Sequence, residues 1–292
     1  MAFLAGCSGA DVAPTSGDGG NGSASTGGTA APDGPPRPER WFGVQDGAVV
    51  VAEGETVAPV VEPGALDEFG ETPILVRLGA ERLFVSFCCE PAEGEAAAVD
   101  LIDGTVFESW SGIISSVTGD DRWARVLTNG MQVLVESPGG DPLATTTREF
   151  LLPAHTTLSP DGETMAVVGV GAGEDVLYAL PPGTAFFEDG TELARGAQNR
   201  VTPALPVIDA DGRVWYVQDR RRAAERVDGV IVDPASGEVL GEFTHPKNVV
   251  DQDFDASGTW LLVVFDDGTL GWRSTTGETG DLPGEGWITA DW

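Results

Sequence analysis

The sequence has 292 residues, of which 47 are Asp or Glu and 16 are Lys or Arg, so its formal net charge at pH 7 is −31. A potential this negative repels phosphate backbones and anionic lipid headgroups, which argues against nucleic acid partners and direct membrane-surface binding. Hydrophobic residues make up 41%, enough for a core, but 40 Gly and 20 Pro argue against a helical bundle. No stretch approaches the roughly 18 to 20 apolar residues of a membrane-spanning helix.

The chain begins Met-Ala-Phe-Leu-Ala-Gly-Cys, and its residues 4–7 resemble the lipobox of bacterial lipoproteins. Of the 16 basic residues only Lys247 is a lysine, which indicates a high-GC codon bias. The resemblance is therefore to lipoproteins of the actinobacterial type. It implies cleavage before Cys7, diacylglyceryl modification of its sulfur, and a protein anchored on the extracytoplasmic face of the cell membrane. No charged segment and no apolar stretch of a signal peptide precede Cys7, so we expect the true start to lie upstream. A cytoplasmic N-terminus with a chance cysteine is the alternative.

Residues 8–40 consist almost entirely of Ser, Gly, Thr, Ala, Pro, Asn and Asp. Such a composition cannot bury enough apolar surface to fold, so we expect a disordered tether. A flexible chain of this length reaches roughly 30 Å. The tether would separate a folded domain at residues 41–292 from the membrane.

Short apolar runs separated by turn dipeptides recur from Trp41 onward. Runs of this kind are typical of strands, and Asp-Gly or Ser-Gly pairs are typical of tight turns. The turns that precede an apolar run are spaced by 34, 40, 41, 50 and 46 residues, and they are Asp46-Gly47, Ala80-Glu81, Asp120-Asp121, Asp161-Gly162, Asp211-Gly212 and Ser257-Gly258. This agrees with the roughly 40 to 45 residues of a four-stranded propeller blade. The sequence therefore predicts an all-β domain of six units, and the 50-residue spacing leaves a seventh unit open.

Three of these turns, Leu158-Ser-Pro-Asp-Gly162, Ile208-Asp-Ala-Asp-Gly212 and Phe254-Asp-Ala-Ser-Gly258, resemble the repeats of bacterial WD40-like and TolB-like β-propellers. The resemblance implies a ring of blades around a channel, and it implies no particular chemistry, because unrelated activities share this fold. We expect the final run, residues 287–292, to pair with the first strand near Gln45. That pairing would close the ring and remove an exposed sheet edge.

No catalytic set stands out in the sequence. The only histidines are His155, expected on an inner strand near the channel, and His245, expected on a loop, and neither has a partner at zinc-ligand spacing. Nucleophile-elbow, phosphate-loop and dinucleotide-binding motifs are absent. Residues 253–260 share only part of the Asp-box of sialidases, which are also propellers.

Two groups of residues are candidates for special chemistry. Cys88 and Cys89 are adjacent at a strand end, where a vicinal disulfide and two separate thiols both remain open. Asp251, Asp253 and Asp255 alternate along one segment, which could place their carboxylates on one face to hold Ca²⁺. Turn formation on a solvated strand is the alternative for the three aspartates. No other cofactor or metal is expected.

The one basic cluster of the domain, Arg220, Arg221, Arg222 and Arg226, lies in a hairpin connection. It is a candidate docking site for an acidic partner or anionic glycan, or else a solvated loop. Taken together, the sequence predicts a lipid-anchored, monomeric propeller that binds an envelope protein or glycan without catalysis and touches the membrane only through its anchor. The alternative is a carbohydrate-active enzyme with a carboxylate pair at the channel, because 47 acidic residues would hide any such pair.

Overall fold

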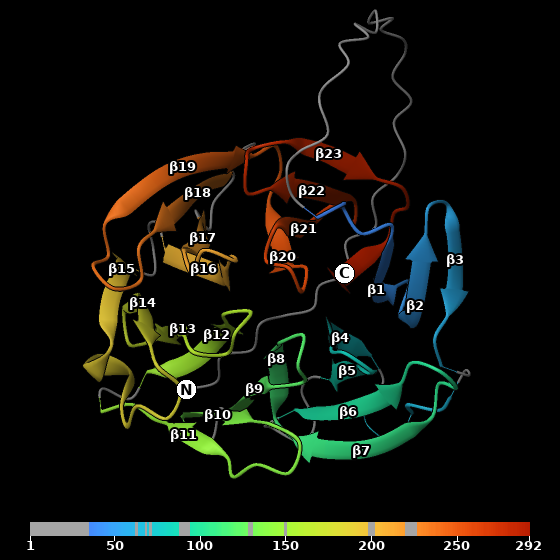
Figure 1. The fold of residues 1–292 in the computed structure, drawn as a ribbon, viewed down its shortest axis with the longest axis horizontal. Helices are drawn as coiled ribbons and strands as arrows, with labels where there is room; N and C mark the ends of the chain where they lie inside the picture. The colour runs from blue at the N-terminus through green and yellow to red at the C-terminus, as the bar shows by residue number, and fades with distance from the viewer. Residues whose placement is uncertain are drawn as a thin grey trace, which may run out of the picture. The chain divides into compact units, whose positions relative to one another are not determined.

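A computed structural model describes residues 35–61, 64–67, 69, 72–87, 94–127, 131–148, 151–197, 202–219 and 227–292. These residues form six four-stranded sheets that follow one another around a ring (Figure 1). The one helical element among them is the short 3₁₀ helix η1, Phe187–Asp189. In the part of the chain described, no helix has the length and apolar character needed to cross a bilayer. The structure confirms the predicted all-β, six-bladed propeller.

We number the blades in chain order and give their strands from the axis outward. Blade 1 consists of β24 (Trp287–Asp291), β1 (Arg40–Gln45), β2 (Ala48–Glu53) and β3 (Thr56–Pro59). Blade 2 consists of β4 (Pro73–Leu78), β5 (Arg82–Phe87), β6 (Glu95–Asp100) and β7 (Val106–Ser111). Blade 3 consists of β8 (Ile113–Val117), β9 (Trp123–Leu127), β10 (Gln132–Glu136) and β11 (Leu143–Thr145).

The other three blades follow the same order. Blade 4 consists of β12 (Leu152–Leu158), β13 (Met165–Val170), β14 (Glu174–Leu180) and β15 (Thr191–Ala197). Blade 5 consists of β16 (Thr202–Ile208), β17 (Val214–Asp219), β18 (Val227–Val232) and β19 (Val239–His245). Blade 6 consists of β20 (Val249–Phe254), β21 (Trp260–Phe265), β22 (Leu270–Ser274) and β23 (Thr279–Leu282).

The ring closes through blade 1, whose inner strand comes from the other end of the domain. β24 pairs antiparallel with β1, with Phe42 opposite Asp291 and Gln45 opposite Trp287. The Gln45 side-chain amide also donates to the Glu285 carbonyl at 2.7 Å. The predicted pairing of the two end segments is therefore confirmed, and it gives β1 a partner along each edge.

The expected turns form because Asp and Ser side chains satisfy the backbone where the chain reverses. At the Ile208–Gly212 turn the Asp209 carboxylate accepts from the backbone N–H of Asp211 and Arg213, at 3.0 and 2.9 Å. Gly212 lies at φ +76°, a conformation that glycine adopts without steric cost. The same arrangement recurs at the corresponding turn of blade 6, where Asp255 accepts from the N–H of Thr259 and Trp260.

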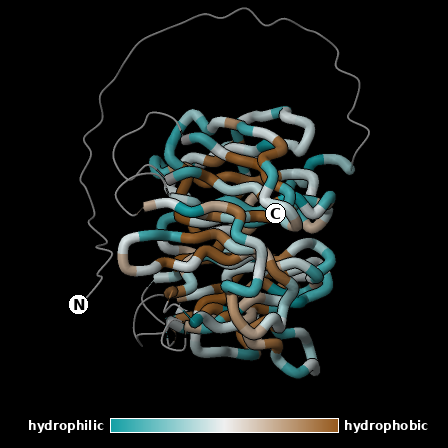
Figure 2. Tube along the Cα trace, turned by 90° about the vertical axis from the view of Figure 1, so that its left-hand side faces the viewer, coloured by the Kyte–Doolittle hydropathy of each residue, from teal (hydrophilic) through white to brown (hydrophobic). Residues whose placement is uncertain are grey.

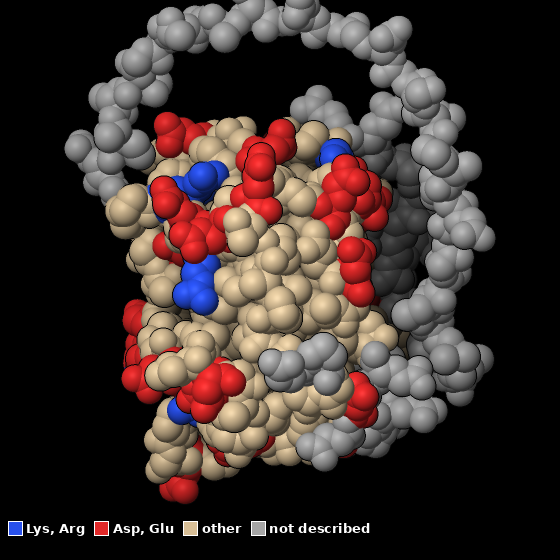
Figure 3. Space-filling view, turned by 90° about the vertical axis from the view of Figure 1, so that its right-hand side faces the viewer, with Lys and Arg blue, Asp and Glu red and all other residues tan. Residues whose placement is uncertain are grey.

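Apolar residues of the second and third strands fill the space between neighbouring blades, and Figure 2 shows hydrophobic segments in the interior of the folded domain. β21 is buried along its whole length, which explains its unbroken apolar sequence Trp-Leu-Leu-Val-Val-Phe. Many charged residues lie on the outer surface, and the side shown in Figure 3 carries several groups of Asp and Glu around a few basic side chains. The negative charge of the chain is thus a property of its outer surface as well as of its sequence.

The structure corrects two of the expectations drawn from the sequence. The 50-residue spacing does not hide a seventh blade, because the extra residues form the connection 181–190 between β14 and β15, which contains η1. His245 is not on a loop: it is the last residue of β19, and its side chain is buried. Its neighbour Pro246 ends the strand, and the apolar surroundings of Phe243 and Phe265 hold the imidazole inside.

Contacts with the blades also begin before residue 41. The Pro35 carbonyl accepts a hydrogen bond from the indole N–H of Trp260 at 2.9 Å, and the Arg37 guanidinium lies over the Trp272 ring, 5.0 Å from its centroid. The last residues of the segment assigned to the tether therefore lie against blade 6.

Candidate functional site

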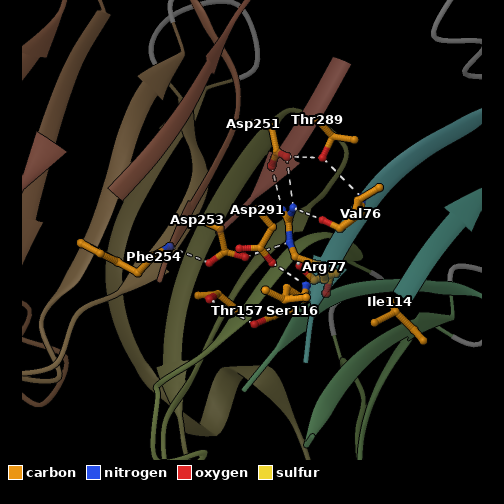
Figure 4. A network of polar contacts seen from close by, with 12 residues as sticks. Val76, Arg77, Ile114, Ser116, Thr157, Asp251, Asp253, Phe254, Thr289 and Asp291 are labelled. Carbon is orange, nitrogen blue, oxygen red and sulfur yellow. Dashed lines mark hydrogen bonds and ion pairs between the residues drawn. The ribbon is translucent and has the colours of Figure 1, made fainter. Parts of the chain in front are cut away.

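The six inner strands, β24, β4, β8, β12, β16 and β20, surround the axis of the ring, and each contacts the next around it. Polar side chains of β4, β8, β12, β20 and β24 take part in the network of polar contacts shown in Figure 4. Because every blade contributes one strand, residues far apart in the sequence meet there.

Arg77 of β4 is the centre of this network, and it is only 5% exposed. Its two terminal nitrogens donate to both carboxylate oxygens of Asp251, at 2.7 and 3.1 Å, and its Nε lies 2.9 Å from Asp253 (Figure 4). The backbone carbonyls of Val76 and Ser115 accept further hydrogen bonds at 2.8 and 3.0 Å. The guanidinium is thus paired with two carboxylates of blade 6, and it binds Asp251 in the bidentate geometry that arginine favours.

The neighbouring carboxylates favour the charged form of the Arg77 guanidinium. Burial by itself would lower the pKa of Arg77, but the charges of Asp251 and Asp253 outweigh burial and raise it. Thr289 of β24 donates its hydroxyl hydrogen to Asp251 and accepts from the Val76 N–H at 3.4 Å. Blades 1, 2 and 6 are therefore joined at the axis by one hydrogen-bonded network.

Two channel carboxyls hold their protons more tightly than an ordinary aspartic acid. Burial raises the pKa of Asp253 to about 6, against the opposing attraction of Arg77. Burial, reinforced by the negative charge of Asp253, raises the pKa of Asp291 well above its usual range, although the N–H groups of Leu78 and Trp292 donate to its carboxylate at 2.7 and 2.8 Å. These two acids differ from Asp251, which is held in the bidentate pair with Arg77.

His155 of β12 lies on an inner strand, as expected, and close enough to the cluster for Asp251 and Arg77 to influence it. Burial is the largest effect and lowers the pKa of its imidazole, while the nearby charges of Asp251 and Arg77 act in opposite directions. His155 is therefore neutral at pH 7.

Beside this cluster the channel opens into a cavity of about 110 Å³. Every blade contributes to its wall through the end of an inner strand or the turn after it, with Gly79, Gly119, Pro160, Ile208, Ala256 and Trp292 as examples. Asp253 and Asp291 also line it. A cavity of this size holds a few water molecules or the end of one side chain, whereas small-molecule sites usually measure roughly 300 to 1,000 Å³.

The three aspartates expected to hold a cation do not gather around one point. Arg77 takes the position between Asp251 and Asp253, and Asp255 turns away to accept the backbone N–H groups of its own turn. Among the described residues there is no group of three His, Cys, Asp or Glu placed to hold a metal ion.

Sequence reasoning missed Arg77, the residue that organises the cluster. A signal was present, because Arg77 is the one charged residue in the apolar strand Pro-Ile-Leu-Val-Arg-Leu, and buried arginines are nearly always paired. The other candidate residues lie outside the described part of the chain, namely Cys7, Cys88, Cys89, Arg220, Arg221, Arg222 and Arg226.

Comparison with known proteins supports the fold. The structure is similar to TolB from Acinetobacter baumannii (TM-score 0.60, 17% identity), covering 86% of this chain and 67% of that one. It is also similar to a chain of a nidogen/laminin complex (TM-score 0.56, 11% identity), covering 86% of this chain and 97% of that one. A third similar structure is hydrazine synthase from Kuenenia stuttgartiensis (TM-score 0.50, 16% identity), covering 72% of this chain and 66% of that one, so this chain spans just under two thirds of its length. No protein-family model and no curated protein matches the sequence.

Removing the central guanidinium should strongly destabilise the ring. Arg77→Met leaves Asp251 and Asp253 buried without a counter-charge, so we expect the free energy of unfolding in urea to fall by about 3–5 kcal/mol. The matched control is Arg148→Met, which breaks the exposed 2.7 Å pair with Asp189 and should cost at most about 1 kcal/mol. Equal losses in the two variants would contradict a central role for Arg77.

The raised pKa of Asp291 predicts how the stability of the folded protein depends on pH. A carboxyl whose folded pKa lies above its unfolded value, about 3.9, makes the folded state bind more protons, so it lowers stability as pH rises between these two values. Asp291→Asn removes this effect, so its stability relative to the unsubstituted protein should increase with pH by at most about 1.4 kcal/mol per unit in that window. Denaturant unfolding at pH 4 to 8 measures this difference, and a pH-independent difference would count against a buried, protonated Asp291.

The exposed Asp103 provides the control of opposite sign. The Thr105 hydroxyl and N–H donate to its carboxylate and lower its pKa. Asp103→Asn should therefore lose relative stability as pH rises through the range in which this carboxyl ionises.

Proposed function

We propose that this chain is a lipid-anchored, extracytoplasmic binding module that acts as a monomer. It holds a partner of the cell envelope, a protein or a glycan, over the channel mouth, which is the name used here for the cavity lined by Asp253 and Asp291. The small cavity beside the Arg77 cluster carries this proposal. At about 110 Å³ it admits the tip of a side chain or a single hydroxyl-bearing group, while the remainder of a partner would lie across the turns that surround it.

The chemistry of the mouth indicates what it would bind. Asp253 and Asp291 line the cavity with carboxyl groups, one ion-paired and one hydrogen-bonded to the backbone. Such groups accept hydrogen bonds from an amine, a guanidinium or a sugar hydroxyl. The nidogen/laminin structure supports a role in assembly, since a chain similar to this one occurs there in a complex between two proteins.

An enzyme acting on carbohydrate is the second candidate, and one observation favours it. Asp253 and Asp291 have raised pKa values, as a general acid requires, and they lie in unlike surroundings. The volume of the cavity argues against this candidate, because a sugar ring flanked by two carboxyls needs more room than the mouth provides.

The proposal of a lipid anchor rests on the lipobox-like Leu-Ala-Gly-Cys segment at residues 4–7, and it is tested separately from binding. When the full-length gene product is expressed with labelled palmitate, we expect label on the protein and none on the Cys7→Ser variant. Absence of label on the unsubstituted protein would refute lipid anchoring at Cys7 and would leave the binding role of the ring untouched.

The mouth is tested by site-specific photo-crosslinking in the native envelope. A photoreactive residue at Ala256, which is exposed at the mouth, should capture a discrete partner. The same residue at Ala235, exposed in the turn between the outer strands β18 and β19, should not. Asp291→Asn should weaken the capture at Ala256 several-fold, and equal capture at both positions would refute binding at the mouth.

A further inference from the structure

A second cavity lies between blades 5 and 6, away from the axis, where the end of β19 approaches β21, β22 and β23 (Figure 1). Its volume is about 340 Å³, within the range of small-molecule sites. Val263, Phe265, Pro246 and Gly271 supply apolar wall, and Arg273 and His245 supply polar groups.

Arg273 differs from seven of the other nine arginines that the structure describes. Among the described residues each of the following has a carboxylate within ion-pair distance: Arg77, Arg82, Arg122, Arg125, Arg148, Arg195 and Arg213. No described carboxylate pairs with Arg273, although the chain has 47 acidic residues. Burial alone accordingly lowers its pKa.

The position of the Arg273 side chain is nevertheless fixed. Its guanidinium lies over the Phe243 ring, 5.0 Å from the centroid, and one terminal nitrogen donates to the Thr244 carbonyl at 3.2 Å. Its Nε is buried and has no hydrogen-bond partner among the described residues. An arginine held in this way is ready to donate to a ligand without first losing side-chain freedom.

His245 provides a second unsatisfied group on the same cavity. The residue is 4% exposed, its ring meets Phe243 and Phe265 edge-on at 5.1 and 6.1 Å, and its Nε2 is buried without a partner in the described part of the chain. Burial and the charge of Arg273 lower its pKa to about 4, so the imidazole is neutral at pH 7 and can carry a proton on Nε2 for donation. Leaving two buried polar groups unpaired costs free energy, which a ligand could recover.

We propose that this cavity, named here the Arg273 site, binds a small organic carboxylate with an apolar body. The carboxylate would accept from the Arg273 guanidinium and the His245 imidazole, which belong to residues that line the cavity, while the apolar body would lie against Phe265, Val263 and Pro246. The exposed Asp281 on β23 also lines the cavity and would repel a second negative charge, which favours a monocarboxylate. Lys247 is not available as a further donor, because it is paired with Asp267 at 2.7 Å.

Benzoate and its neutral analogue benzamide are the probes, and the two histidines are the reporters. His245 lies on the Arg273 site and His155 lies on the channel, so imidazole resonances distinguish the two places within one sample. We expect millimolar benzoate to move the His245 resonances and to raise its titration midpoint above about 4, with the His155 resonances unchanged. Benzamide should bind at least tenfold more weakly.

Two variants locate the binding. Arg273→Gln should weaken benzoate binding at least tenfold, whereas Arg195→Gln, which alters an exposed arginine on the outer strand of blade 4, should leave it unchanged. If Arg273→Gln fails to fold, Thr279→Trp places a bulky side chain at an exposed position on the rim and should abolish binding without changing the buried groups. Equal binding of benzoate and benzamide, a shift at His155 alone, or no binding at 10 mM would each refute the proposal.

Discussion

The ion pair between Arg77 and two aspartates is the interaction on which the centre of this molecule depends. A buried guanidinium is tolerated only when its charge and its hydrogens are matched, and here Asp251 and Asp253 supply the charge while two backbone carbonyls accept the remaining hydrogens. Because Arg77 is on blade 2 and the aspartates are on blade 6, the match exists only when the ring has its correct curvature. The cluster can therefore form only in the correctly closed ring, which it also stabilises. Thr289 extends the cluster to blade 1.

The architecture could be predicted because its signals are local. Each Asp-Gly or Ser-Gly turn combines a side chain that accepts backbone hydrogens with a glycine that accommodates positive φ, as at Asp209 and Gly212, so the turn can be recognised from a few adjacent residues. The spacing of such turns then gives the blade. The pairing of β24 with β1 is not local, but it follows from the requirement that both ends of the sheet series find an edge.

The site could not be predicted in the same way. Arg77 and Asp251 are 174 residues apart, and nothing in the sequence around either residue indicates that the other is its partner. The alternation of Asp251, Asp253 and Asp255 correctly suggests that carboxylates share a face, but the strand ends at Phe254, so Asp255 belongs to the turn. His245 was expected on a loop but is the last residue of β19, directly before Pro246, so here the expectation differs from the structure by the exact end of a strand. In each case the missing information was a strand boundary or a partner on another blade.

The order in which the closing strands are made has a consequence for biogenesis. β1 is among the first strands to leave the ribosome, yet its inner partner β24 follows every other strand of the ring, and Gln45 bonds a carbonyl 240 residues further along the chain. During synthesis, β1 therefore carries an open backbone edge until the whole repeat series has emerged. A chain that ends before β24 lacks this partner, so the inner edge of β1 stays open to pairing with other chains, which favours aggregation.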